Sequence, residues 1–175
     1  MTRQQFIELI EKDGKAVYSF CCMLAGCRED GEELYQETML SAVEYCRNID
    51  SSLNPKSYLM GTALKLYQGK RRKYLRRQRI APMGELTQEL ETMLGDDSPS
   101  LEERAIKQEQ CMAVRREVQR LPEKLRVVVY LYYTAQLSLE EIAFNLHIPE
   151  GTVKSRLHKA RALLRKRLEA YSYEE

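Results

Sequence analysis

The sequence predicts an all-helical protein of two small domains joined by a flexible acidic linker. Apolar residues recur at helical spacing along most of the chain, and Gly and Pro are scarce, at eight and five of 175 residues. The composition also changes between about residues 80 and 104. We therefore expect independently folding domains over residues 1–79 and 105–175, with residues 80–104 as the linker.

The N-terminal domain has the pattern of two or three helices before a longer, basic one. A polar break over residues 27–31 separates two apolar periodic stretches. Asn54 before Pro55 suits a helix start, with Asn as the N-cap and Pro at the first helical position. This helix runs into residues 70–79, which hold seven Lys or Arg and no carboxylate. Such a basic block predicts contact with a polyanion.

An acidic linker and then a short apolar run follow the basic block. Residues 85–104 hold seven carboxylates against Arg104 alone, and the segment leaves room for one short helix over residues 86–94. The apolar run VVVYLYY, residues 127–133, favours a strand by propensity. It is short and has no partner strand, so we expect a buried helix inside a four-helix C-terminal domain.

A helix-turn-helix is predicted near the C-terminus. Ser138 and Glu141 form the pattern of a capping box, His147 lies in the tight turn with an expected positive φ, and Pro149 suits the next helix start. The second helix is basic, and its outward side chains are suited to phosphates and base edges. The predicted DNA-binding residues are Thr152, Lys154, Ser155, Arg156, His158, Lys159, Arg161 and Arg165.

Several classes of function receive no support from the sequence. The chain shows no apolar run long enough to span a bilayer and no signal-peptide core, so we expect a cytoplasmic protein. The five Cys form no CxxC pair and lie far from both His residues, so we expect reduced, mostly buried thiols, no metal and no cofactor. Without a Gly-rich phosphate loop or a nucleophile motif, an enzyme is not expected.

The two halves together resemble one family. LSLEEIAFNLHIPEGTVKSRLHKARALLRKRL resembles the promoter-reading C-terminal domain of extracytoplasmic-function (ECF) sigma factors, although His147 stands where Gly is usual. REDGEELYQETMLSAVEY resembles the polymerase-binding helix of that family. The second resemblance implies that core RNA polymerase is contacted by Asp30, Glu33, Leu34, Gln36 and Glu37.

NPKSYLMGTALKLYQGKRRKYLRR resembles the family helix that receives the melted minus-ten element. Lys65 stands where Asn is common and Gly69 where Asp is common, which affects the base that this helix reads. An aromatic ring with nearby cations suits unstacked bases, and the preceding loop resembles a pocket for a flipped base. The implied minus-ten residues are Asn48, Ser51, Ser52, Asn54, Lys56, Tyr58, Lys65, Arg71 and Arg72.

The resemblance implies a dissociable sigma factor that binds core RNA polymerase and promoter DNA and aids promoter melting, with an anti-sigma factor as a further partner that the family allows. A stand-alone helix-turn-helix regulator is the alternative, and it leaves the N-terminal motif unexplained. Response-regulator effectors are one kind of such regulator, but the sequence shows no alternating pattern of strands and helices, which a receiver domain would require.

Overall fold

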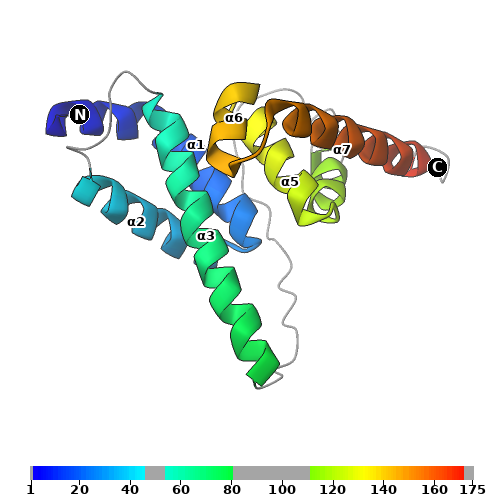
Figure 1. The fold of residues 1–175 in the computed structure, drawn as a ribbon, viewed down its shortest axis with the longest axis horizontal. Coiled ribbons are helices and arrows are strands. Elements are labelled where there is room, and N and C mark those ends of the chain that lie inside the picture. Colours follow the sequence, from blue (N-terminus) through cyan, green and yellow to red (C-terminus); the bar gives the residue numbers. More distant parts are fainter. Residues whose placement is uncertain (1, 46–53, 81–110, 172–175) are drawn as a thin grey trace, which may run out of the picture.

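The computed structural model describes residues 2–45, 54–80 and 111–171, and this part of the chain forms helices without strands (Figure 1). The expected all-helical fold is therefore confirmed. In chain order the elements are α1 (Arg3–Ala25), α2 (Arg28–Tyr45), α3 (Pro55–Ile80), a helical stretch over 111–119, α5 (Glu123–Val129), a π-helical turn η2 (Tyr130–Thr134), α6 (Leu139–Leu146) and α7 (Glu150–Tyr171).

Helices α1, α2 and α3 pack together as the N-terminal half. Thr2 and Gln5 form a capping box at the start of α1, with hydrogen bonds of 3.3 and 2.8 Å. The close approach of α1 and α2 depends on Gly31, because a Cβ there would lie 2.6 Å from the Cα of Cys22. Figure 1 shows the second half of α3 extending beyond its neighbours.

The C-terminal half contains the helix that the VVVYLYY run was expected to form. Val127, Val128 and Val129 are buried on α5, and the chain then widens into the π-helical turn, where the backbone N–H of Ala135 donates to the carbonyl of Tyr130 at 3.0 Å. The buried helix is thus confirmed, whereas its π-helical end was not predicted. Helices α6 and α7 pack on this unit and complete the half.

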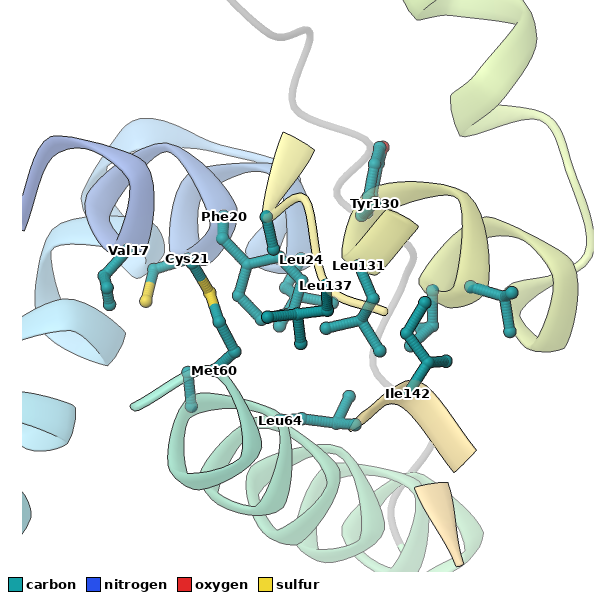
Figure 2. Close-up of a cluster of buried hydrophobic side chains, with 14 of the residues drawn as sticks. Val17, Phe20, Cys21, Leu24, Met60, Leu64, Tyr130, Leu131, Leu137 and Ile142 are labelled. Atoms are coloured by element: carbon teal, nitrogen blue, oxygen red, sulfur yellow. The ribbon is translucent and has the colours of Figure 1, made fainter. Parts of the chain in front are cut away.

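The two halves share one apolar core (Figure 2). Its side chains come from α1, from α3 and from the segment after α5: Phe20, Leu24, Met60, Leu64, Leu131, Leu137 and Ile142. The side chains of the two halves are therefore in contact within the described residues, and whether residues 1–79 and 105–175 fold independently stays a prediction. Periodicity predicts which side chains are buried, but the partner helix that buries them depends on the tertiary packing. The residues of the predicted linker, including its short helix, lie outside the described ranges apart from Ile80.

The cysteines are less buried than expected. Cys21 is buried, and that burial raises the pKa of its thiol to about 12. Cys22 and Cys27 are half-buried and Cys111 is exposed, and all four are free thiols. Cys46 lies outside the described residues, so the expectation of mostly buried thiols is wrong for the four cysteines that are described.

None of the described helices has the length and apolar character needed to cross a membrane.

Glu117 links the first and last helices of the C-terminal half. Its side chain is only 2% exposed and pairs with Arg120 Nη1 at 2.6 Å and Arg167 Nη1 at 3.4 Å. Glu117→Ala should lower the free energy of unfolding by about 2 to 3 kcal/mol, less than a wholly buried pair because both arginines are partly exposed. Urea denaturation measures this, with Arg115→Ala on the exposed face as the control. Equal midpoints for the two variants would contradict it.

Candidate nucleic-acid interface

Helices α6 and α7 form a helix-turn-helix. The capping box at α6 is present, because Ser138 Oγ accepts from the Glu141 N–H at 3.1 Å and Glu141 Oε2 accepts from the Ser138 N–H at 2.7 Å. His147 ends α6 at φ 51°, the positive value expected from the sequence. The carbonyl of Pro149 then accepts from the backbone N–H of Thr152 at 2.9 Å, which starts α7.

One stripe of α7 is buried and the rest faces solvent. Val153, Leu157 and Ala160 are buried and Leu164 is half-buried, as the spacing predicts. Of the eight predicted DNA-binding side chains, six are exposed, and Thr152 and Arg156 are half-buried at the border of the stripe. The expected donors therefore lie around the part of α7 that its buried stripe leaves free.

Two of these cations already pair with carboxylates on α7. Lys154 Nζ lies 2.8 Å from Glu150 Oε1, and Arg165 Nε lies 3.8 Å from Glu169 Oε1. The sequence predicts a face without carboxylates, and this holds for residues 151–168 but not for Glu150 and Glu169, which flank them. Both pairs are exposed, so solvent and salt weaken them and a phosphate can compete for the cation.

Arg161 is held in place by two tyrosines that the sequence analysis did not single out. Its guanidinium carbon lies 5.6 Å from the ring centroids of Tyr132 and Tyr133, and its Nε donates to Tyr133 Oη at 2.8 Å. That hydrogen bond raises the pKa of Arg161 above its ordinary value. The contact joins η2 to α7, so no sequence spacing announces it.

The predicted minus-ten residues are partly brought together at the start of α3. Asn54 Oδ1 accepts from the Lys56 N–H at 3.1 Å, which confirms Asn54 as the N-cap. Tyr58 is half-buried, and Lys56 pairs with Asp13 at 3.4 Å. Asn48, Ser51 and Ser52, the predicted pocket residues of the preceding loop, lie outside the described residues.

The remaining minus-ten candidates lie further along α3. Lys65 and Arg72 are exposed, and Arg72 Nε donates to the carbonyl of Gln68 at 3.3 Å. Arg71 is half-buried and pairs with Glu123 at the start of α5. Arg71 therefore joins the two halves, and of these three only Lys65 and Arg72 lie exposed on α3.

The predicted polymerase-binding residues lie on α2. Asp30, Glu33 and Gln36 are exposed and Glu37 is half-buried, whereas Leu34 is only 1% exposed and supports the helix from beneath. Lys70 of α3 reaches Glu33 at 3.2 Å and Glu37 at 3.1 Å. Burial disfavours the charged form of Lys70, but the two carboxylates outweigh it and raise its pKa.

Two large apolar side chains extend this face of α2. Leu40 is 66% exposed and Val43 is 53% exposed, one and two turns beyond Gln36 on the same side of the helix. From the sequence, both count among the second apolar periodic stretch, because an apolar residue at helical spacing is normally assigned to a core. Within the described part of the chain, His, Cys, Asp and Glu side chains form no group of three that could hold a metal ion.

Comparison with known proteins agrees with this arrangement. Residues 9–81 match the family description "Sigma-70 region 2", and residues 111–164 match "Sigma-70, region 4". The chain is 30% identical over 170 residues to the ECF RNA polymerase sigma factor SigW of Bacillus subtilis, covering 93% of this chain and 88% of that protein. It is 28% identical over 168 residues to SigE of Mycolicibacterium smegmatis, covering 95% of this chain and 63% of that protein.

The fold is also found in solved structures. The sigma factor RpoE, in its complex with the anti-sigma factor NepR from Bartonella quintana, superposes with a TM-score of 0.80 at 20% identity, over 95% of this chain and 98% of RpoE. CnrH, solved with the cytosolic domain of CnrY, gives 0.66 at 19% identity, over 97% of this chain and 90% of CnrH. With a helix-turn-helix, an N-terminal region 2 and a relative aligned over most of both lengths, the chain belongs to the ECF sigma factors, which direct RNA polymerase to promoters.

Proposed function

We propose that this sigma factor divides its work between named helices. Helix α2 binds core RNA polymerase, the start of α3 with the loop before it receives the melted minus-ten strand, and α7 reads the minus-thirty-five duplex. RNA synthesis stays in the polymerase, so the chain itself is not an enzyme, and it works in the cytoplasm beside its polymerase. The working units are residues 1–79 and 105–175, connected by residues 80–104.

The surface of α7 carries this proposal. A single helix of 22 residues, held by a capped helix and a tight turn, presents cations and hydroxyls on the faces that its buried stripe leaves free. Such a helix fits the major groove, where its first turns approach base edges and its cations approach phosphates. A stand-alone regulator would use the same helix but would leave the region 2 match over residues 9–81 without a role.

An anti-sigma factor is part of the proposal. The two solved neighbours named above were determined as complexes: RpoE is bound to the anti-sigma factor NepR, and CnrH to the cytosolic domain of CnrY. We infer that this chain has a comparable regulator, and co-purification of the tagged chain from its own cells would identify it.

Run-off transcription tests the function directly. Core RNA polymerase is mixed with the purified chain and a genomic library, and the transcripts are sequenced. We expect discrete start sites that require the chain and share sequence elements upstream. A stand-alone regulator would instead bind duplex DNA without co-purifying with core polymerase and without starting transcripts.

Substitutions on α7 should separate base reading from phosphate contact. Arg156→Ala should reduce promoter affinity by about 1 to 3 kcal/mol and relax the preference at one base pair, because a long guanidinium in the groove reads a base edge. Lys154→Ala should reduce affinity evenly across promoter sequences. Binding to a library of single-base promoter variants measures both effects. An even loss for Arg156→Ala would contradict its assignment to a base.

A further inference from the structure

Helix α6 of the C-terminal half lies directly against the start of α3, the proposed minus-ten helix. Asn145 Nδ2 donates to Ser57 Oγ at 2.8 Å, and Ser57 is only 7% exposed. The Asn145 side chain rests on Gly61, where a Cβ would lie 2.2 Å from Asn145 Oδ1. A side chain at position 61 would therefore force Asn145 away from Ser57.

A second contact joins the same two helices at their N-termini. Asn54 Nδ2 donates to Glu141 Oε1 at 2.6 Å, while the other oxygen of Glu141 caps α6 through the Ser138 N–H. One carboxylate thus serves the N-terminal ends of α3 and α6, both of which carry partial positive charge. The amide of Asn54, a proposed contact to the flipped base, is occupied in this conformation.

The contact is incompatible with simultaneous reading of both promoter elements. The minus-ten and minus-thirty-five elements are about 25 base pairs apart, or about 85 Å along a duplex at 3.4 Å per base pair. Only three residues separate α6 from α7, and α6 is held against α3 by the hydrogen bond from Asn145 to Ser57, so α7 cannot move away from α3 while this contact persists. Figure 1 shows α6 between the upper part of α3 and the start of α7.

We infer that the α3–α6 contact is an autoinhibitory latch, which stays closed until polymerase separates the two halves. Asn145 lies on Gly61 and donates to Ser57, and so holds the C-terminal half over the minus-ten helix. Glu141 meanwhile occupies the side-chain amide of Asn54. The inhibitory consequence rests on the proposed function, whereas the latch itself does not. A partner that binds only the open form gains apparent affinity as the open fraction rises.

Gly61→Ala tests the latch, with Gly69→Ala as the matched control. Both replace a glycine in α3 by a better helix former, but a Cβ at position 69 meets no atom within 4 Å. Losing one hydrogen bond of the latch should raise the opening constant about fivefold. Gly61→Ala should therefore bind core polymerase about fivefold more tightly than Gly69→Ala. Amide exchange over residues 57–64 and 139–146 should accelerate by a similar factor, even where the open form is rare.

A second variant keeps the test valid where Gly61→Ala folds poorly. Asn145→Ala removes the same bond from the other side and should show the same two effects. The double variant should add less than twofold to Asn145→Ala, since truncating Asn145 frees the space above position 61. The latch is overturned if the Gly61→Ala and Asn145→Ala variants show the same amide exchange rates and the same affinity for core polymerase as Gly69→Ala. A wild-type chain that fails to bind core polymerase would overturn the proposed function instead, and the exchange rates would still decide on the latch.

Discussion

The affinity of this chain for duplex promoter DNA should fall about 250- to 1000-fold when the salt concentration rises from 50 to 200 mM. Each phosphate that a cation neutralises releases condensed counterions, and about four to six contacts give a log–log slope of roughly −4 to −5. The cations of α7 can supply this number, because its outward faces carry Lys154, Arg156, Lys159, Arg161 and Arg165. The α7 surface stays exposed in the closed conformation, so the full chain can be used.

Fluorescence anisotropy over a salt series measures the slope, and two lysine variants locate the surface. Lys159→Ala, exposed on α7, should reduce the slope by about one. Lys12→Ala, exposed on α1 and outside the set of residues proposed to contact DNA, should leave it unchanged. A flat salt response, or equal slopes for the two variants, would exclude α7 as the electrostatic contact.

Replacing Gln36 and Glu37 together by Ala should weaken binding to core polymerase about 100-fold, since central interface residues commonly contribute about 2 kcal/mol each and neighbouring contributions add incompletely. Leu40→Ala should cost about tenfold or more, because an apolar side chain that is 66% exposed in the free chain suits the centre of an interface. Neither change touches the core, so the free energy of unfolding should hardly move.

Core binding by fluorescence and run-off transcription should be measured on the same set of variants. Lys154→Ala and Arg156→Ala serve as the matched set on α7, where promoter use should fall while core binding is spared. Lys70→Ala separates direct contact from indirect effects at α2, since Lys70 pairs with both Glu33 and Glu37. Loss of core binding by the α7 variants as complete as that of the α2 variants would refute the division of labour.

The sequence predicted the features of this protein that depend on local chemistry. The Asn54 cap, the capping box of Ser138 and Glu141, the positive φ at His147 and the buried stripe of α7 were all expected, and the structure has them. Each follows from residues within one or two helical turns, where spacing alone decides which groups meet.

The polar surfaces were predicted less completely. The residues of α2 were identified by resemblance to a motif, and that motif includes Leu34, which the structure buries at 1% exposure. Leu40 and Val43 fit the apolar pattern of a core face but are exposed, because periodicity cannot tell an apolar residue facing a core from one facing a partner. The tyrosines around Arg161 were missed because they belong to another element.

Tertiary structure alone decided how the halves meet. By itself the sequence determined that the chain is helical, the caps at Asn54 and Ser138, the order of region 2 before region 4 and the family. It could not determine that Phe20 and Leu64 share a core with Leu131, or that Asn145 rests on Gly61. The physical reason is that periodicity and capping are properties of one helix, whereas packing depends on the shapes of two surfaces brought together from distant parts of the chain.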